Sequence, residues 1–446
     1  MKYDIIVIGG SAAGVIVAMT SRKLYKDKKI LVIKKLEKEL VPCGIPYIFH
    51  TLGSVENDFM GIEEKFKANN IDLIIDEVID GNTEEKKIIT KEGKEFEYDK
   101  LVIATGSTPY VIPIPGHELE NVVTIPKNFK YLTKVQEKLK EAKNVVIIGG
   151  GFIGIEVADE IKKAGKNVTL IEAMKHLLPA SFDSDFGNIA KEEIESDNVR
   201  VLVNTKAKEI SGNGKVEKVI LENGEEISAD LVIMATGYKP NSDLAKKMGI
   251  KTTDWGYIET DDYMRTSVKD VFAAGDCVQH KDYFTGKPSK LMLASAAVFD
   301  ARIAAFNLYK LRLLRTNKGS LNAYSTMIGG KAFAAAGITE AVAKTEGFGI
   351  IVGKAEVVDR HPGKFADASK IILKLIFSKE CGTLLGAQIV GGKSVGEMIN
   401  IISLAIQKGL NIKDLLTMQI GTHPLLTSAP TVYPLAVAAE QALSQM

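Results

Sequence analysis

The feature that most constrains the fold is a glycine-rich turn between an apolar strand and a helix. Residues 144–148 predict a buried strand, residues 149–154 read Gly-Gly-Gly-Phe-Ile-Gly, and residues 155–164 predict a helix. A G-x-G-x-x-G turn in this setting is typical of a βαβ unit that binds a dinucleotide, because its backbone N–H groups approach the pyrophosphate at the helix N-terminus. The glycines expected to contact the nucleotide are Gly149, Gly151 and Gly154.

An acidic residue follows the second strand of this unit. Residues 167–171 predict that strand, and Glu172 stands directly after it. A carboxylate at this place accepts hydrogen bonds from a ribose 2′-hydroxyl. The same negative charge would repel a 2′-phosphate, so we expect NADH rather than NADPH.

A second unit of this kind opens the chain, with its strand, helix and strand expected at residues 3–8, 15–24 and 29–33. The turn at residues 9–14 has the spacing G-x-S-x-x-G, and the small Ser11 still lets the backbone approach a pyrophosphate. Lys34 and Lys35 stand where the acid that holds the ribose is expected, so the ribose contact of this unit stays open. The expected phosphate contacts are Gly9, Ser11 and Gly14.

Two further strands end in an Ala-Thr-Gly turn, and a third ends in Gly-Asp. The first two lie at residues 101–107 and 231–238, and the third at residues 266–276. An Asp directly after a strand is well placed to bind a ribityl or ribose hydroxyl, and a helix expected over 295–308 would point its positive end at a flavin ring. The residues singled out in these turns are Thr105, Gly106, Gly237, Gly275 and Asp276.

Three cysteines, Cys43, Cys277 and Cys381, are far apart and lack CxxC spacing. This spacing argues against a metal cluster or a disulfide scaffold and fits a reducing cytoplasm. Cys43 lies in Val-Pro-Cys-Gly-Ile-Pro, where Pro and Gly keep it out of a strand and a helix is expected to begin beside the sulfur. A helix N-terminus stabilises a thiolate, so we expect a redox-active thiol with a lowered pKa. The alternative is a buried structural thiol.

The composition argues against several classes of function. Hydrophobic residues make up 46% of the chain, charged residues 25%, and the net charge is +1, so nothing indicates affinity for nucleic acid. No apolar run reaches membrane-spanning length, and the N-terminus is a strand rather than a signal peptide. We therefore expect a cytoplasmic protein without nucleic-acid or membrane partners.

The pattern of predicted strands and helices changes from about residue 323. Apolar strands at 371–377 and 384–390 and a helix over 396–408 indicate an α+β domain without a nucleotide turn. Near its end, His423 lies on a loop bounded by proline and is a candidate acid or base. A structural histidine is the alternative.

Taken in this order, the two dinucleotide units, the two Ala-Thr-Gly turns and Gly275-Asp276 resemble the two-dinucleotide-binding-domain flavoprotein disulfide reductases over the whole chain. The glutathione reductase branch of that superfamily carries a C-x-x-x-x-C pair, whereas Ile48 stands at the partner position here. A single cysteine in Pro-Cys-Gly-Ile-Pro-Tyr is similar to the branch of coenzyme A disulfide reductases, NADH oxidases, NADH peroxidases and persulfide reductases.

The resemblance implies an α/β fold with two Rossmann-like domains and a C-terminal α+β dimerisation domain, assembled as a homodimer. Residues 1–110 and 240–322 would bind FAD, residues 111–239 would bind NAD(H), and residues 323–446 would form the dimerisation domain. The implied FAD contacts are Gly9, Ser11, Gly14, Thr105, Gly106, Gly275 and Asp276, and the implied NADH contacts are Gly149, Gly151, Gly154, Glu172 and Gly237.

Three positions refine what the resemblance implies. Oxidase and peroxidase members carry a His in the first glycine turn, where this chain has Ala12 and Ala13, which weakens peroxide chemistry. Arg22 fits the place of an Arg that contacts nucleotide phosphates in coenzyme A reductases, with a solvated surface charge as the alternative. The tyrosine of those reductases is absent around His361, so His423 is expected to reach the thiol of the partner subunit.

We therefore expect an NADH-dependent flavoprotein that reduces a disulfide or persulfide, of coenzyme A disulfide or polysulfide type, through Cys43. One alternative is an NADH oxidase that reduces oxygen with a Cys43 sulfenate. Another is an NADH-dependent electron-transfer flavoprotein in which Cys43 takes no part.

Overall fold

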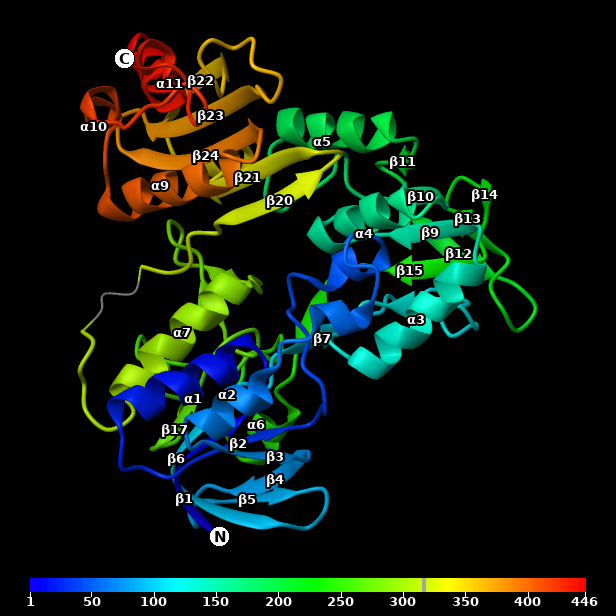
Figure 1. The fold of residues 1–446 in the computed structure, drawn as a ribbon, viewed down its shortest axis with the longest axis vertical. Helices are drawn as coiled ribbons and strands as arrows, with labels where there is room; N and C mark the ends of the chain where they lie inside the picture. Colours follow the sequence, from blue (N-terminus) through cyan, green and yellow to red (C-terminus); the bar gives the residue numbers. More distant parts are fainter. Residues whose placement is uncertain (315–317) are drawn as a thin grey trace.

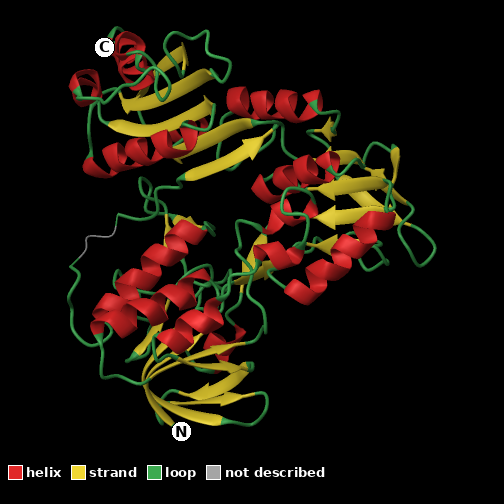
Figure 2. Ribbon diagram, viewed as in Figure 1, coloured by secondary structure: helices red, strands yellow, loops and turns green. Residues whose placement is uncertain are grey.

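The computed structural model describes residues 1–314 and 318–446, which build three large sheets in three regions of the molecule (Figures 1 and 2). In the view of Figure 1 the N-terminal sheet lies at the bottom, a central sheet at the right and the C-terminal sheet at the top. No helix among the described residues is long and apolar enough to cross a membrane.

The N-terminal sheet has seven strands, with a parallel centre in the order β3-β2-β1-β6 and β17 also parallel to β6. Strand β2 reads Ile-Leu-Val-Ile-Lys and is buried throughout, as expected for a parallel strand covered on both faces. Helices α1 and α7 pack side by side on this sheet (Figure 1). The elements of this region are β1 (Lys2–Ile8), α1 (Ala12–Leu24), β2 (Ile30–Lys34), α2 (Ile62–Ala68), β3 (Asp72–Ile75), β4 (Val78–Asn82), β5 (Lys87–Thr90), β6 (Glu95–Ile103), α6 (Asp243–Lys247), β17 (Val271–Ala273), β18 (His280–Lys281), β19 (Pro288–Ser289) and α7 (Ala294–Asn307).

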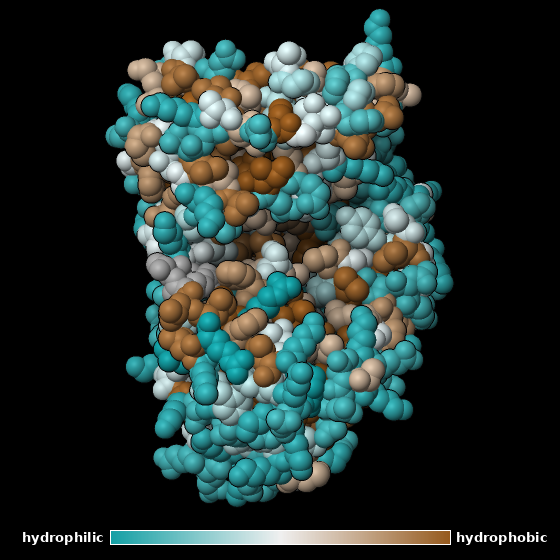
Figure 3. All heavy atoms as spheres, turned by 60° about the vertical axis from the view of Figure 1, so that its left-hand side comes forward, coloured by the Kyte–Doolittle hydropathy of each residue, from teal (hydrophilic) through white to brown (hydrophobic). Residues whose placement is uncertain are grey.

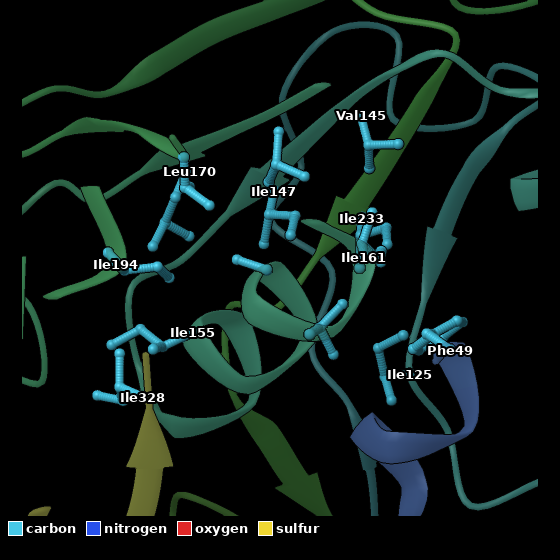
Figure 4. Packing of buried hydrophobic residues seen from close by; sticks show 14 of the residues in the cluster. Phe49, Ile125, Val145, Ile147, Ile155, Ile161, Leu170, Ile194, Ile233 and Ile328 are labelled. Carbon is cyan, nitrogen blue, oxygen red and sulfur yellow. The ribbon is translucent and has the colours of Figure 1, made fainter. Parts of the chain in front are cut away.

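The central sheet is parallel throughout, in the order β11-β10-β9-β15-β8. In Figure 4 its strands direct Ile147, Leu170 and Ile233 toward Ile155 and Ile161 of helix α4, which forms one buried apolar layer. The elements of this region are β8 (Val122–Thr124), α3 (Phe129–Glu141), β9 (Asn144–Ile148), α4 (Phe152–Lys163), β10 (Asn167–Ile171), α5 (Ser184–Ser196), β11 (Arg200–Leu202), β12 (Ala207–Ser211), β13 (Lys218–Leu221), β14 (Glu226–Ser228) and β15 (Leu231–Met234).

Two short strands connect these regions. Strand β7 (Ser107–Pro109) pairs antiparallel with β16 (Tyr238–Pro240), and each follows one of the Ala-Thr-Gly turns. The turns therefore mark the two places where the chain crosses between the N-terminal and central sheets, and this pairing brings both turns to the same junction.

The C-terminal sheet is antiparallel, in the order β20-β21-β24-β23-β22. Helix α9 packs against β21 and β24, and helix α11 against β22 and β23. The space-filling view shows the surface hollowed at mid-height, with apolar atoms inside the hollow (Figure 3). The elements of this region are β20 (Tyr324–Ile328), β21 (Lys331–Gly337), α8 (Glu340–Thr345), β22 (Ile350–Val358), β23 (Lys370–Ser378), β24 (Leu384–Gly391), α9 (Val395–Lys408), α10 (Ile412–Thr417) and α11 (Pro434–Leu443).

A buried ion cluster joins the C-terminal sheet to the central region. The Lys374 side chain is 1% exposed, and its ammonium group contacts the carboxylates of Asp183 (3.2 Å), Asp185 (2.7 Å) and Glu340 (2.9 Å). Burial alone would raise the pKa of Asp183, but hydrogen bonds from the N–H groups of residues 340 and 341 and the Lys374 charge hold it below its usual value. Because Asp183 stands directly before α5 and Lys374 lies on β23, the cluster fixes the two regions against each other.

We expect Lys374→Ala to destabilise the protein strongly, because it leaves the buried Asp183 carboxylate without its cation. Removing one partner of a buried ion pair costs roughly 3–5 kcal/mol, which lowers the thermal midpoint by several degrees. The matched control is Lys370→Ala on the same strand, whose side chain is 61% exposed and pairs with Glu356 at the surface. That control should change the free energy of unfolding by less than about 1 kcal/mol. Equal shifts in the midpoints of the two variants would contradict the role of the cluster.

Candidate active site

Cys43 lies on the loop that follows β2 and is exposed to solvent. The loop is fixed by an isolated bridge between Leu40 and Phe59 and by a turn in which the Gly44 N–H donates to the Val41 carbonyl (2.8 Å). Gly44 then caps a short 3-10 helix, η1 (Ile45–Phe49). A helix does begin beside the sulfur, as predicted, but it has only five residues, so its dipole at the thiol is weak.

The central region holds the segment that follows Cys43. Glu160 of α4 accepts hydrogen bonds from the Thr51 N–H (2.7 Å) and hydroxyl (2.9 Å). Gln136 of α3 donates to the Ile48 carbonyl (2.7 Å) and accepts from the Val55 N–H (3.2 Å). The thiol, which the N-terminal region supplies, is therefore positioned at the junction with the central sheet.

Asp58 packs against the residue next to the thiol. A Cβ atom on Gly44 would lie 1.9 Å from the Asp58 Oδ1 atom, so only glycine fits between this carboxyl and the turn. The Asp58 residue is 3% exposed, and its Oδ2 atom has no hydrogen-bond partner among the described residues. Burial raises its pKa to about 6.

Glu156 is the acidic residue that sequence reasoning missed. It lies on α4 two residues after Gly154, and the Thr326 hydroxyl from β20 donates to it (2.6 Å). Burial raises its pKa to about 7, so the carboxyl can take up and release a proton near neutral pH. Its spacing from the glycine turn is the only sequence signal that could have drawn attention to it.

These surroundings correct the expected titration of Cys43. Although the residue reaches the surface, neighbouring protein atoms withdraw its sulfur partly from water, which raises the pKa of the thiol above its ordinary value. The Glu156 carboxylate raises it further, with smaller contributions from Asp276 and Asp58. Lys127 opposes them. The prediction of a lowered pKa was wrong for the chain alone, because the sequence shows the helix start but not the carboxylates that fold around the sulfur.

The residues of the first glycine turn fit FAD. A Cβ on Gly9 would lie 2.1 Å from the Ala104 carbonyl oxygen, and one on Gly14 would lie 1.9 Å from the Gly9 oxygen, so both positions exclude side chains. A Cβ on Gly106, whose φ is +67°, would meet nothing within 4 Å, which leaves open space beside the Ala-Thr-Gly turn. Gly275 also has a positive φ, +86°.

Asp276 is held in place at this site by two donors. The Ser107 hydroxyl and the Lys127 ammonium group each donate to its Oδ2 atom at 2.7 Å. Burial would raise the pKa of Asp276, but the Lys127 charge and these hydrogen bonds hold it below its usual value. The ionised carboxylate can accept a hydrogen bond from a hydroxyl of the cofactor, which is the role predicted from the sequence. Lys127 is a further residue of this site that the sequence did not indicate. The Thr105 hydroxyl, by contrast, donates to the Asn241 carbonyl. It therefore stabilises the place where the chain passes between the N-terminal and central regions.

The second glycine turn fits a pyridine nucleotide. Cβ atoms on Gly149 and Gly154 would lie 2.4 Å and 1.8 Å from carbonyl oxygens, whereas those on Gly151 and Gly237 would meet nothing within 4 Å. Glu172 is buried and accepts hydrogen bonds from the N–H groups of residues 150 and 174, both at 2.7 Å. The glycine turn thus orients the Glu172 carboxylate, and a ribose would bind next to this turn.

Arg22 requires a correction. Its guanidinium group donates to the backbone carbonyls of Lys26 (2.8 Å), Lys28 (2.9 Å) and Asn70 (2.7 Å). Arg22 lies in the last turn of α1, eight residues and therefore about 12 Å along the helix from Gly14. The guanidinium group therefore connects the segment after α1 to the segment before β3 through backbone carbonyls. This structural role differs both from the predicted phosphate contact and from the alternative of a solvated surface charge.

His423 is exposed on a loop of the C-terminal region, and within the described part of one chain no hydrogen bond or ion pair links it to the Cys43 segment. Its Nδ1 atom accepts from the Leu425 N–H (3.2 Å). His361 supports this loop, because its ring contacts the Thr427 carbonyl (3.0 Å) and its N–H donates to the Pro424 carbonyl (3.1 Å). Two loops of the C-terminal region therefore hold His423 at the surface.

Two family models match the chain. The pyridine nucleotide-disulphide oxidoreductase model covers residues 3–301, and the model of the dimerisation domain of that family covers residues 325–432. The chain therefore belongs to the pyridine nucleotide-disulphide oxidoreductases, which confirms the predicted family and the α/β fold with its C-terminal dimerisation domain.

Its relatives are similar over nearly their whole length. An NADH oxidase of Methanocaldococcus jannaschii is 35% identical over 99% of each chain. An NAD(P)H coenzyme A polysulfide/persulfide reductase of Pyrococcus horikoshii is 33% identical over 98% of each. The structure of an NAD-dependent persulfide reductase from A. fulgidus matches with a TM-score of 0.92 and 32% identity, over 100% of this chain and 83% of that chain.

These comparisons confirm the predicted enzyme class and cofactors. The chain is a pyridine nucleotide-disulfide oxidoreductase that uses FAD and NAD(P)H. The two glycine turns described above are the places at which the chain's own residues fit these groups.

We expect Glu156→Gln to lower the pKa of Cys43, because it removes the charge that most opposes the thiolate. The measurement is the pH dependence of Cys43 alkylation by iodoacetamide in the apoprotein, made in a Cys381→Ser background because Cys381 is the other exposed thiol. At a fixed pH between 8 and 9 the variant should react several-fold faster, since Glu156 is then largely ionised in the parent. Glu192→Gln, which removes an exposed carboxylate of α5 outside the Lys374 cluster, is the control. An unchanged alkylation profile in Glu156→Gln would contradict the coupling.

Proposed function

We propose that this protein is an NADH-dependent flavoprotein that reduces a low-molecular-weight disulfide or persulfide, of coenzyme A disulfide or polysulfide type, with Cys43 as its single redox-active cysteine. The observation that carries this proposal is the position of Cys43, a free and exposed thiol at the junction of the two nucleotide-binding regions. Cys277 is fully buried and Cys381 lies in the C-terminal region, so neither is placed to form a redox pair with it.

The chain's own part in this reaction begins with the Cys43 thiolate. It attacks one sulfur of the substrate disulfide, a bond forms between the Cys43 Sγ atom and that sulfur, the substrate S–S bond breaks, and the other sulfur leaves as a thiolate that takes a proton. Bound FAD and NADH supply the two electrons that reduce the resulting mixed disulfide back to two thiols. The Val41–Gly44 turn and the contacts of Thr51 with Glu160 hold the sulfur in place.

Two groups are suited to supply the proton. Glu156 has a pKa near 7 and raises the pKa of Cys43, so it can hold a proton beside the sulfur. In a homodimer, His423 of the partner subunit would reach the leaving thiolate, which fits its exposed position on a supported loop. The matching dimerisation domain supports this assembly.

We also propose how the domains are divided. Residues 1–110 and 240–322, of which 315–317 lie outside the described residues, would hold FAD through Gly9, Ser11, Gly14, Gly106, Gly275 and Asp276. Residues 111–239 would hold NADH, and residues 323–446 would form the dimer contact. Glu172 favours NADH because a 2′-phosphate would meet its buried carboxylate. The three free cysteines fit a cytoplasmic location.

An NADH oxidase is the second candidate, since relatives as similar as that of Methanocaldococcus jannaschii carry this name. It would cycle Cys43 through a sulfenate. Ala12 and Ala13 leave the first glycine turn without the histidine that oxidase members carry there, which favours the sulfur substrate. An electron-transfer flavoprotein remains a third reading, in which Cys43 is dispensable.

The decisive experiment is anaerobic oxidation of NADH by the FAD-loaded protein, with coenzyme A disulfide or polysulfide as the only acceptor. We expect turnover that falls at least about 100-fold in Cys43→Ser, because neither of the other two cysteines lies at the junction of the nucleotide-binding regions. Cys381→Ser, the second exposed thiol, should keep full activity. Turnover that needs oxygen but still needs Cys43 would support the oxidase. Acceptor turnover unchanged in Cys43→Ser would support the electron-transfer protein.

We expect His423→Ala to slow reduction of the disulfide by about 100-fold or more, because a general acid typically contributes roughly 10²- to 10⁴-fold to the rate. Reduction of an artificial acceptor that takes electrons without the thiol, such as a quinone, should be unchanged. His117→Ala, in the central region, serves as the control. Disulfide turnover that His423→Ala leaves at the parent rate would assign the proton to another group, and Glu156→Gln would then be measured in the same assay.

A further inference from the structure

The two glycine turns of this chain differ in the residue that stands beside them. In the central region, Glu172 directly follows β10, and a Cβ on Gly150 would lie 2.9 Å from its Cβ atom. In the N-terminal region, Lys34 ends β2, and a Cβ on Gly10 would lie 2.9 Å from its Cβ atom. Lys34 therefore occupies the place in the first unit that Glu172 occupies in the second.

Lys34 cannot perform the task of an acid at this place. An ammonium group has three donors and no acceptor, so it cannot accept a hydrogen bond from a ribose hydroxyl. Its side chain is 1% exposed, and its Nζ atom is already bound to Glu63 (2.5 Å) and to the Glu37 carbonyl (2.9 Å). The ribose acceptor of the first unit must therefore come from elsewhere in the chain.

A carboxylate from the following loop lies at the same point. The Oε1 atom of Glu39 lies 3.2 Å from the position of a Gly10 Cβ, on the side of the turn where Glu172 lies in the other unit. The backbone fixes its position, because the Glu39 carbonyl accepts from the Met60 N–H (2.9 Å) and the neighbouring Leu40 is bridged to Phe59.

The Glu39 carboxylate lacks a partner of its own. The residue is 6% exposed, yet within residues 1–314 and 318–446 its side chain makes no hydrogen bond or ion pair. Burial raises its pKa, while the charges of Lys34 and Lys127 oppose this shift. Neither carboxylate oxygen is among the fully enclosed atoms that lack a partner, so the carboxylate of this largely buried residue still reaches solvent, and water or a ligand can supply its hydrogen bonds.

We propose that Glu39 accepts hydrogen bonds from the adenosine ribose of FAD, in place of the acid that Lys34 has displaced. Lys34 then acts as a positioning residue, because its cation lies near the carboxylate and favours the ionised form. The inference depends on FAD binding to the first unit and not on the sulfur substrate proposed for Cys43, so either can fail without the other.

The test measures the dissociation constants of the apoprotein for FAD and for FAD whose adenosine lacks the 2′-hydroxyl, from the quenching of flavin fluorescence on binding. The variants are Glu39→Leu, which keeps the side-chain size without an acceptor, and Glu39→Gln, which keeps one acceptor oxygen. Glu37→Gln is the matched control, because it removes an exposed carboxylate from the same loop.

In the parent protein and in Glu37→Gln we expect the 2′-deoxy cofactor to bind about tenfold or more weakly than FAD, the effect of one hydrogen bond to a charged acceptor. In Glu39→Leu, FAD itself should bind about tenfold or more weakly than in the parent, and the ratio of the dissociation constants for 2′-deoxy FAD and FAD should fall to near one. In Glu39→Gln this ratio should lie between the values for the parent and for Glu39→Leu. A general disturbance of the fold would weaken both cofactors equally and leave the ratio unchanged, and that result would overturn the assignment, as would a ratio of one in the parent.

Discussion

The site depends on one buried carboxylate, that of Glu160, which binds the segment after Cys43 to helix α4. The residue is fully buried and accepts from the Thr51 N–H and hydroxyl, while Lys163 of the same helix compensates its charge (3.0 Å). Hydrogen bonds to a charged acceptor are among the stronger ones in proteins. Because this bond joins the region that supplies the thiol to the region that would bind NADH, it fixes how far the sulfur lies from the second glycine turn.

Helix α4 carries several of the residues that build the site, because its periodicity places them at its start and along one face. Gly154 packs on the glycine turn at the start of α4, the charge of Glu156 acts on the Cys43 thiol, and Glu160 is one turn further along the face that bears Glu156. The N–H groups at the start of α4 also face the place of a pyrophosphate. A shift of α4 would therefore displace the nucleotide site, the acid near the sulfur and the anchor of the Cys43 loop together.

What the sequence predicted well is what local patterns determine. Strands with glycine turns at residues 9–14 and 149–154, and the Gly275-Asp276 ending, were found because each is encoded by neighbouring residues. Groups that approach from distant segments were missed: Glu156, Lys127 and Asp58 meet near Cys43 only after the regions pack together. Arg22 was assigned wrongly for the same reason, since one of its carbonyl partners, Asn70, lies far along the chain.

The charges around Cys43 explain why its reactivity is a property of the assembled enzyme. Within the described residues the thiol is surrounded by the carboxylates of Glu156, Asp276 and Asp58, and the cation that opposes them, Lys127, is bound to Asp276. This arrangement favours the neutral thiol in the isolated chain. If Cys43 is the nucleophile, its thiolate must gain stabilisation from groups that the isolated chain does not supply, such as bound cofactors or, in a dimer, the second subunit. Thiol reactivity would then rise only when these groups are in place, which limits oxidation of the sulfur in incomplete molecules.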